Sequence, residues 1–351
     1  MIMSKLLRQF GLGAFIITVF GFSVALASAS TTAVNFESPA YTLGTINLQD
    51  GWSSFGAAGS GCAVYDHAVS SSLSTPGFGT QSLRISNAVT SGCFSDQTFS
   101  KSLTDEAGET LAQNGGMSSG TRQKHFEAEW SFASAVPGAE QPGLSVVASP
   151  DRGDGARMSW VQMADTPAGL AVNFFDYQDG AVEPAGTCTA GSNFVSSAVV
   201  TGLDRSIPHK IKITMDFVDG ANNDIVKVYV DGVLKHTGTS WEGYFNYCEG
   251  NPTRTVDSVL FRTGGTAAPA TLGNGFLIDN LTVSSGPIPP VLTSPTNKNQ
   301  CKKDGWKTFN NPVFKNQGQC IKFVENLRDN HDDDDDGKDR NDHDRSHGRD
   351  D

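Results

Sequence analysis

The fold is decided by residues 209–238, which read HKIKITMDFVDGANNDIVKVYVDGVLKHTG. From Lys210 to Phe217 polar and apolar residues alternate, and this period of two is typical of a β-strand that buries one face. A second alternating run ends at Asp231-Gly232, a dipeptide that favours a tight hairpin turn. The stretch therefore predicts antiparallel strands joined by short turns.

The same pattern recurs on both sides of this stretch. Strands are expected downstream at Ser258–Arg262 and Phe276–Val283, and upstream at Ala33–Glu37 and Gln123–Phe132. Glycine is abundant, with 38 residues, and helical periodicity is scarce, which favours β structure with many turns. We expect about twelve strands in two packed sheets, separated by loops that include the stretch 56–82.

These residues also carry a family resemblance. The hairpin IKITMDFVDG…VYVDGVL resembles that of laminin-G-like and concanavalin A-like lectin/glucanase domains. The flanking TSWEGYF, GFLIDNL and NFESPAYTLGTINLQDGW resemble secreted bacterial members of that superfamily, over residues 31–285. The resemblance implies an all-β, two-sheet antiparallel jelly-roll sandwich. It implies no single activity, because lectins, hydrolases, lyases and adhesion modules share this fold.

Composition divides the chain into parts. The first residues combine basic Lys5 and Arg8 with an apolar core and small residues, which is typical of a cleaved signal peptide; an uncleaved membrane anchor is the alternative. The expected parts are a signal peptide (1–29), the sandwich (30–285), a proline-rich linker (286–298), a small disulfide-closed module (299–326) and a disordered acidic tail (327–351). The module resembles a short cysteine-containing motif found at the C-termini of exported bacterial proteins.

The charge distribution restricts the partners. The net charge is −12, and the tail from His331 to Asp351 contributes −6 of it, from ten Asp against four Lys and Arg. This acidity argues against nucleic acid. No later segment is apolar enough to span a membrane, so we expect a secreted or cell-surface protein.

Six cysteines follow the signal segment, and an even number in an exported chain predicts disulfides. Six cysteines allow fifteen connectivities, and we expect each to pair with its neighbour in sequence. The expected pairs are Cys62–Cys93, Cys188–Cys248 and Cys301–Cys320. A metal site built from these cysteines is disfavoured because the chain has no CxxC pair.

Two carboxylates could hold a metal. Glu37 and Asp279 lie on the first and last expected strands, and alternation places Asp279 on the same face as Leu281 and Val283. A carboxylate on an apolar face must be paired, protonated or metal-bound. In the carbohydrate-binding jelly rolls that this chain resembles, such a pair helps to hold a structural Ca²⁺ together with backbone carbonyls. A local twist that exposes Asp279 is the alternative.

An aromatic loop is the candidate glycan contact. Aromatic rings stack on sugars while Glu and Asn bind hydroxyl groups, although the same rings could instead cap the edge of the sandwich. The residues expected to bind carbohydrate are Trp241, Glu242, Tyr244, Asn246 and Tyr247.

Glu127 and Glu129 share one face of a strand, about 7 Å apart, a spacing at which paired carboxylates can hydrolyse glycosides. The glucanases in this superfamily carry an E-x-D-x-x-E strand motif, whereas this chain reads E-x-E-x-x-F and lacks the closing acid. We therefore expect a non-catalytic, carbohydrate-binding or adhesion protein. A glycoside hydrolase or polysaccharide lyase that uses the two glutamates is one alternative, and a module that binds another extracellular protein is the other.

Overall fold

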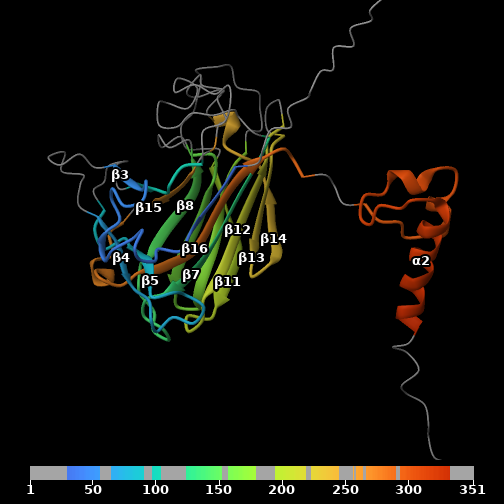
Figure 1. Cartoon of the computed structure of the whole chain (residues 1–351). Coiled ribbons are helices and arrows are strands. Elements are labelled where there is room, and N and C mark those ends of the chain that lie inside the picture. The colour runs from blue at the N-terminus through green and yellow to red at the C-terminus, as the bar shows by residue number, and fades with distance from the viewer. Residues whose placement is uncertain are drawn as a thin grey trace, which may run out of the picture. The chain divides into compact units, whose positions relative to one another are not determined.

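The computed structural model describes residues 30–55, 65–90, 97–103, 124–151, 157–178, 194–218, 223–244, 256, 258–263, 266–289 and 293–332. The chain divides into two compact units, Met1–Ile288 and Pro289–Asp351. Figure 1 shows the strands of the first unit and the single long helix of the second. Within the described residues, no helix is long and apolar enough to cross a membrane.

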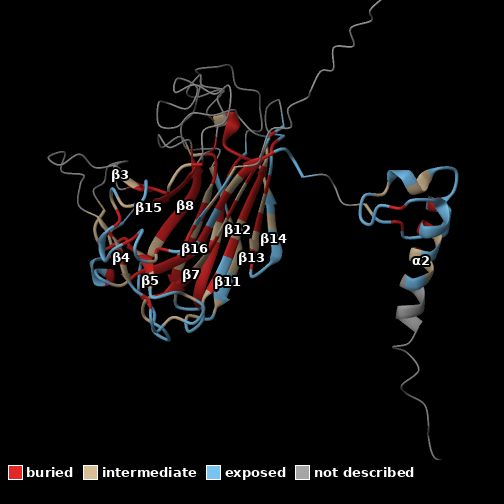
Figure 2. Ribbon diagram, viewed as in Figure 1, coloured by how far each residue is buried: buried red, intermediate tan, exposed pale blue. Residues whose placement is uncertain are grey.

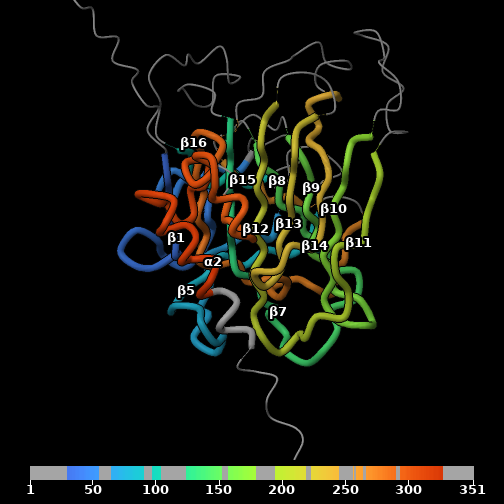
Figure 3. Tube along the Cα trace, turned by 90° about the vertical axis from the view of Figure 1, so that its right-hand side faces the viewer, coloured from blue at the N-terminus to red at the C-terminus, as the bar shows by residue number. Residues whose placement is uncertain are grey.

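The strands of the first unit form two antiparallel sheets, seen again after a quarter turn in Figure 3. The large sheet runs in the order β14 (Val233–Gly238), β13 (Ile225–Val230), β12 (His209–Asp216), β7 (His125–Ser134), β16 (Phe276–Gly286), β5 (Gln81–Ser86), β4 (Asp66–Ser71) and β2 (Gly44–Thr45), with β1 (Ser30–Val34) paired to β16. The small sheet runs in the order β11 (Phe194–Leu203), β10 (Gly169–Tyr177), β9 (Trp160–Thr166), β8 (Ser145–Asp151), β15 (Ser258–Arg262), β6 (Gln97–Phe99) and β3 (Ser53–Phe55).

The core lies between the two sheets, and buried residues alternate with partly exposed ones along strands such as β7 and β9 (Figure 2). Trp130 of β7 meets Phe261 of β15 edge to face, with ring centroids 6.0 Å apart. Trp52 stacks on the same Phe261 ring at 6.3 Å. Because these rings come from both sheets, they lock the layers together through buried apolar area and aromatic contacts.

The predicted fold class, an all-β two-sheet antiparallel jelly-roll sandwich with a small C-terminal disulfide module, is confirmed. The strands at residues 209–238 pair as expected, and the first and last strands are neighbours. Two details were wrong. β1 ends at Val34, so Glu37 lies in the loop beyond it, and the expected loop 56–82 contains β4. β4 was missed because DHAVSS carries too few β-branched or aromatic residues to signal a strand.

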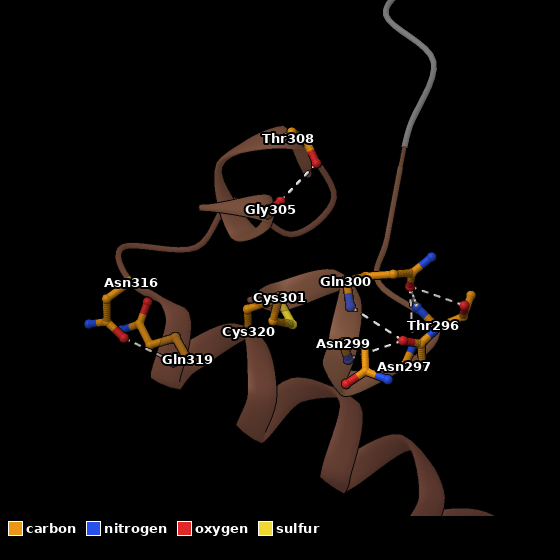
Figure 4. Close-up of a disulfide and its surroundings, with 10 residues drawn as sticks. All are labelled: Thr296, Asn297, Asn299, Gln300, Cys301, Gly305, Thr308, Asn316, Gln319 and Cys320. Carbon is orange, nitrogen blue, oxygen red and sulfur yellow. Dashed lines mark hydrogen bonds between the residues drawn. A yellow bond between two sulfur atoms is a disulfide. The ribbon is translucent and has the colours of Figure 1, made fainter. Parts of the chain in front are cut away.

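The second unit is a separate small fold built from η2 (Lys298–Cys301), η3 (Gly305–Thr308) and α2 (Gln317–Asp332). Asn297 caps η2, since its side chain accepts hydrogen bonds from the amides of Asn299 and Gln300 (Figure 4). The predicted disulfide Cys301–Cys320 is present, with the two Cα atoms 5.7 Å apart. α2 continues to Asp332, past the expected end of the module at Asn326, and the rest of the acidic tail lies outside the described residues.

Candidate functional site

The outer faces of the two sheets differ in chemistry. On the large sheet, Lys210 pairs with Glu129 at 2.9 Å and Lys212 approaches Glu127 at 3.6 Å. These pairs join β12 to β7 on a solvated surface, where each contributes at most about 1 kcal/mol. In the middle of the small sheet, the outer positions include Ser145 on β8, Gln162 on β9 and Asn173 on β10, with the aromatic residues Trp160 and Phe175 beside them. A surface of that kind suits the hydroxyl groups of a ligand better than it suits charge.

A hydrogen-bonded row of polar side chains crosses three strands of the small sheet. Gln162 of β9 donates its Nε2 hydrogen to Ser145 Oγ on β8 at 2.7 Å, and its Oε1 accepts from Asn173 Nδ2 on β10 at 3.1 Å. The neighbouring positions Val161 and Met163 are fully buried in the core, so the alternation of β9 places Gln162 on the outer face. All three polar side chains are partly exposed. We call Ser145, Gln162 and Asn173 the amide row.

An aromatic pair flanks the amide row. Trp160 lies opposite Phe175 in the pairing of β9 with β10, and their rings meet edge to face with centroids 5.9 Å apart. The guanidinium carbons of Arg157 and Arg262 each lie 5.4 Å from the centroid of the Trp160 ring. At this distance the ring attracts each guanidinium group through a cation–π contact.

The predicted glycan-binding loop borders this aromatic group. Trp241 is only 5% exposed, packs on Trp160 with ring centroids 5.2 Å apart, and donates its indole hydrogen to the Phe175 carbonyl at 2.9 Å. Glu242 is 8% exposed, and Tyr244 packs on Phe194. The structure thus places Trp241 inside a packed cluster rather than on an open platform. Asn246 and Tyr247 lie outside the described residues.

The amide row was missed at the level of sequence. The stretches WVQMADT and GLAVNFFDY were interpreted only as strands, because their apolar content dominates. A signal was present, since each strand carries one amide at a position that alternates with buried residues. Only the register, which sets Gln162 opposite Asn173, shows that the two amides meet.

Glu37 and Asp279 are brought together by the segment between Gly77 and Gln81. The Gly79 amide donates to Asp279 Oδ2 at 3.1 Å, and the Gln81 amide donates to Glu37 Oε1 at 3.0 Å. The Thr80 hydroxyl donates to the other Glu37 oxygen. The two carboxylates therefore share one loop, although they are distant in sequence.

A β-bulge corrects the predicted face of Asp279. The pairing of β16 with β7 shifts between Asp279 and Thr282, and Asn280 adopts a left-handed conformation with φ 52°. The extra residue breaks the alternation. Leu281 and Val283 point into the core, whereas Asp279 lies on the other side of the strand and is still only 1% exposed.

The electrostatics of this pair are unfavourable. Burial raises the pKa of the Asp279 carboxyl above its ordinary value, and the nearby charge of Glu37 raises it further, against the hydrogen bonds from the Asn280 and Gly79 amides. The hydrogen bonds from Thr80 and Gln81 lower the pKa of Glu37. Because the folded pKa of Asp279 exceeds its unfolded value, its ionised form costs stability at neutral pH, and protonation or a bound cation would relieve that cost.

Glu37 and Asp279 supply some, but not all, of the ligands that a bound cation needs. Two carboxylates lie close together, and no ion pair within the described ranges involves either of them. Oxygen donors of this kind suit Ca²⁺. However, the described residues contain no group of three or more His, Cys, Asp and Glu that could hold a metal. Backbone carbonyls or water would have to complete the shell.

Of the predicted disulfides, Cys301–Cys320 is described and the other four cysteines lie outside the described residues. Glu127 and Glu129 have side chains 34% and 30% exposed, and each faces a lysine. Their surroundings are alike, so nothing distinguishes an acid from a nucleophile as glycoside hydrolysis requires.

No family model matches this chain, and no curated protein matches it. Among solved structures, an alginate lyase in complex with an alginate trisaccharide is 9% identical over 72% of this chain and 97% of its own, with a TM-score of 0.41. An endo-1,3-β-glucanase from Streptomyces sioyaensis is 17% identical over 73% and 96%, with a TM-score of 0.39. The carbohydrate recognition domain of Emp46p is 13% identical over 55% and 78%, with a TM-score of 0.29. All three likenesses are weak, and no residue of this chain takes a role from them.

Proposed function

We propose that this protein binds a glycan on the outer face of the small sheet and does not cleave it. The observation that supports the proposal is the amide row, which presents hydrogen-bonding groups across β8, β9 and β10. Each amide retains donor and acceptor capacity beyond its one or two bonds within the row. Sugar hydroxyls at the spacing of neighbouring strands could use that capacity.

The aromatic group supplies the second component of such a site. Phe175 and Trp160 are partly exposed and lie directly beside the amide row. Partly exposed rings next to convergent polar groups are the usual composition of a site for a polar organic ligand. Trp241, which packs on Trp160, would then form a wall of the site. The roles of Glu242, Tyr244, Asn246 and Tyr247 as further contacts stay predictions.

A binding screen tests this proposal. The full chain would be titrated with soluble neutral and acidic polysaccharides, and each binding glycan would be measured again with Gln162→Ala. Losing the hydrogen bonds of one amide should weaken binding several-fold to about tenfold. Lys227→Gln, on the outer face of the large sheet, is the control and should bind normally. The proposal would be overturned if the wild type bound no glycan. It would also be overturned if Gln162→Ala bound as tightly as the wild type and the Lys227→Gln control.

Catalysis by Glu127 and Glu129 stays an alternative prediction. It requires detectable cleavage of a glycan that is lost in Glu127→Gln and Glu129→Gln. Cleavage that survives both substitutions would remove these residues from consideration. An adhesion role would instead appear as protein binding that is indifferent to Gln162→Ala.

We also propose that Glu37 and Asp279 bind a structural Ca²⁺, and that the protein is exported through its first 29 residues. Two neighbouring carboxylates, one of them almost fully buried, support the calcium site. Calcium should raise the thermal unfolding midpoint of the wild type, and EDTA should lower it. The midpoint of Asp279→Asn should be the same in calcium and in EDTA. Asp50→Asn, whose carboxylate pairs with Lys101, is the control. A midpoint that ignores calcium in the wild type would contradict the site.

A further inference from the structure

β11 forms one margin of the small sheet, and one of its two edges has no strand beside it. In the part of the chain that the structure describes, β11 pairs with β10 only and ends the strand order of its sheet (Figure 3). Among the described residues, none of Phe194–Leu203 has a hydrogen bond or ion pair outside that pairing, and none is buried. In an antiparallel ladder, alternate residues direct their N–H and C=O groups away from the partner strand. A row of exposed backbone donors and acceptors therefore runs along β11.

The chemistry of β11 favours pairing with another strand. Its ten residues, FVSSAVVTGL, include no charged residue and no proline, and Val195 is 38% exposed. Proteins usually protect a free edge by making it short, charged or irregular. Four other edge strands follow this rule: β1, β2 and β3 have five, two and three residues, and β14 carries Lys235 and pairs with β13 through a shift in register. β11 has no such protection over Phe194–Ala198, where its pairing with β10 is regular.

The regular part of β11 is complementary to itself. It is centred on Ser196, and antiparallel pairing of two copies about this residue sets Phe194 of each copy opposite Ala198 of the other. Because Ala198 lies opposite Asn173 on β10, these alternate side chains share the outer face of the sheet. The pairing places a large ring against a small side chain and a hydroxyl group against a hydroxyl group. It brings no like charges together, which favours a second copy of the same strand as the partner.

We propose that the protein forms a dimer in which the β11 strands of two copies pair antiparallel, so that the two small sheets become one continuous sheet. The backbone groups along β11 would then be hydrogen-bonded on both edges, as in other complexes that form by strand addition. A net charge of −12 makes two copies repel each other at long range, while the contact itself is uncharged. Added salt should therefore tighten the dimer, because it screens the repulsion.

The dimer has one consequence for glycan binding, and only this consequence rests on the proposed function. The two-fold axis of an antiparallel strand pair is perpendicular to the sheet, so the outer faces of both copies lie on the same side. The two amide rows would then face the same direction, and one polysaccharide chain could contact both. A long polymer should gain avidity over a short oligosaccharide without any new contact.

Sedimentation of the full chain tests the dimer without any glycan, so its failure is distinguishable from a failure of the glycan site. The wild type should sediment as a dimer in the micromolar range, and more completely when sodium chloride is added. Ser196→Lys should be monomeric, because two ammonium groups would meet at the two-fold axis. Thr237→Lys places the same charge at an exposed position of β14 and should remain dimeric. A monomeric wild type, or a Ser196→Lys chain that still dimerises, would overturn the proposal.

A cross-link keeps the proposal testable if Ser196→Lys does not fold. Residues directly opposite each other in an antiparallel pair have Cα atoms about 4.5–5.5 Å apart, which is within the range of a disulfide. Ser196→Cys should therefore give a reducible covalent dimer under mild oxidation, whereas Thr237→Cys should stay monomeric on the same non-reducing gel. Absence of the cross-link in Ser196→Cys, or equal cross-linking of the two variants, would show that β11 does not pair with itself.

Discussion

His67 is a buried histidine held between the two sheets. Its Nδ1 shares a hydrogen bond with Thr98 Oγ1 on β6 at 2.6 Å, and its Nε2 is buried without a partner among the described residues. Burial lowers the pKa of His67 from 6.5 to about 3, the charge of Asp66 raises it, and that of Arg84 lowers it. The imidazole is therefore neutral in the folded protein over most of the pH range.

This pKa predicts acid sensitivity. Between pH 6 and pH 4 the unfolded chain gains a proton on His67 and the folded chain does not, so the free energy of unfolding falls as pH falls. The slope should approach about 1.4 kcal/mol per pH unit in excess of that of His67→Gln. Urea unfolding at several pH values measures it. If the two proteins show the same slope over this window, His67 is not buried as a neutral group.

At the scale of the residue, the sequence identified which side chains could form a site, but not how deeply each one is buried or what it contacts. Glu37 and Asp279 were identified as a pair, and the structure does hold them on one loop. Trp241 was named as a glycan contact, with a ring that caps the edge of the sandwich as the alternative, and it is packed on Trp160 and Phe194. An aromatic residue in a loop has the same sequence signature whether it is exposed or buried, because both depend on which segments fold against it.

At the scale of the element, the entry into β16 depends on Gly275. Its φ is 99°, and a Cβ atom there would lie 2.2 Å from the carbonyl oxygen of Ile85, a backbone atom that cannot move aside. Gly273 also has a positive φ, of 75°, but a Cβ there would meet nothing within 4 Å. Alanine substitutions at the two glycines therefore distinguish the cost of a positive φ from the cost of steric overlap.

Gly275→Ala should therefore lower the free energy of unfolding by more than about 3 kcal/mol, whereas Gly273→Ala should cost only about 1 kcal/mol. Chemical unfolding of both variants, monitored by the fluorescence of the buried tryptophans, provides the comparison. Similar losses in the two variants would mean that the approach of Gly275 to β5 is looser than the structure indicates.

Alternation predicted most of the long strands but not their irregularities. The bulge at Asn280 adds one residue to β16, so Leu281 and Val283 share the core face with Ile278 while Asp279 lies on the opposite face. A one-residue shift leaves no trace in composition, since both sides of the bulge alternate correctly. Only the observed register of β16 with β7 reveals the bulge.

At the scale of the whole molecule, the C-terminal unit depends on its disulfide. Its buried apolar set is small, consisting of Cys301, Phe314, Cys320 and Val324. A bridge across a sequence separation of 19 stabilises a chain by about 3 kcal/mol, which is a large share of the stability of so small a fold. The unit should therefore unfold without the bridge.

Replacing both residues, as Cys301→Ser with Cys320→Ser, should abolish amide-exchange protection in α2 and leave protection in β7 and β12 unchanged. Hydrogen-exchange mass spectrometry of the full chain measures both regions at once. Protection of α2 that survives would show that packing alone holds the unit, and lost protection in β7 would show that the two units do not fold separately.

The sequence predicted a sandwich, but not which of its two outer faces carries the amide row. The distinction arises only when Gln162 meets Asn173 on one sheet and the lysines of β12 meet the glutamates of β7 on the other. Function was assigned to a loop because loops are visible in a sequence, whereas a face assembled across three strands is not.

The central claim is that a glycan lies on the amide row, and the side-chain amide resonances of Gln162 and Asn173 test it most directly. Binding of an oligosaccharide to the labelled full chain should shift both NH₂ pairs, because the sugar hydroxyls replace water at these groups, and should leave the large-sheet amides of Lys210 and Lys212 in place. Saturable binding that shifts the resonances of the large sheet, while those of Gln162 and Asn173 stay unchanged, would contradict the account.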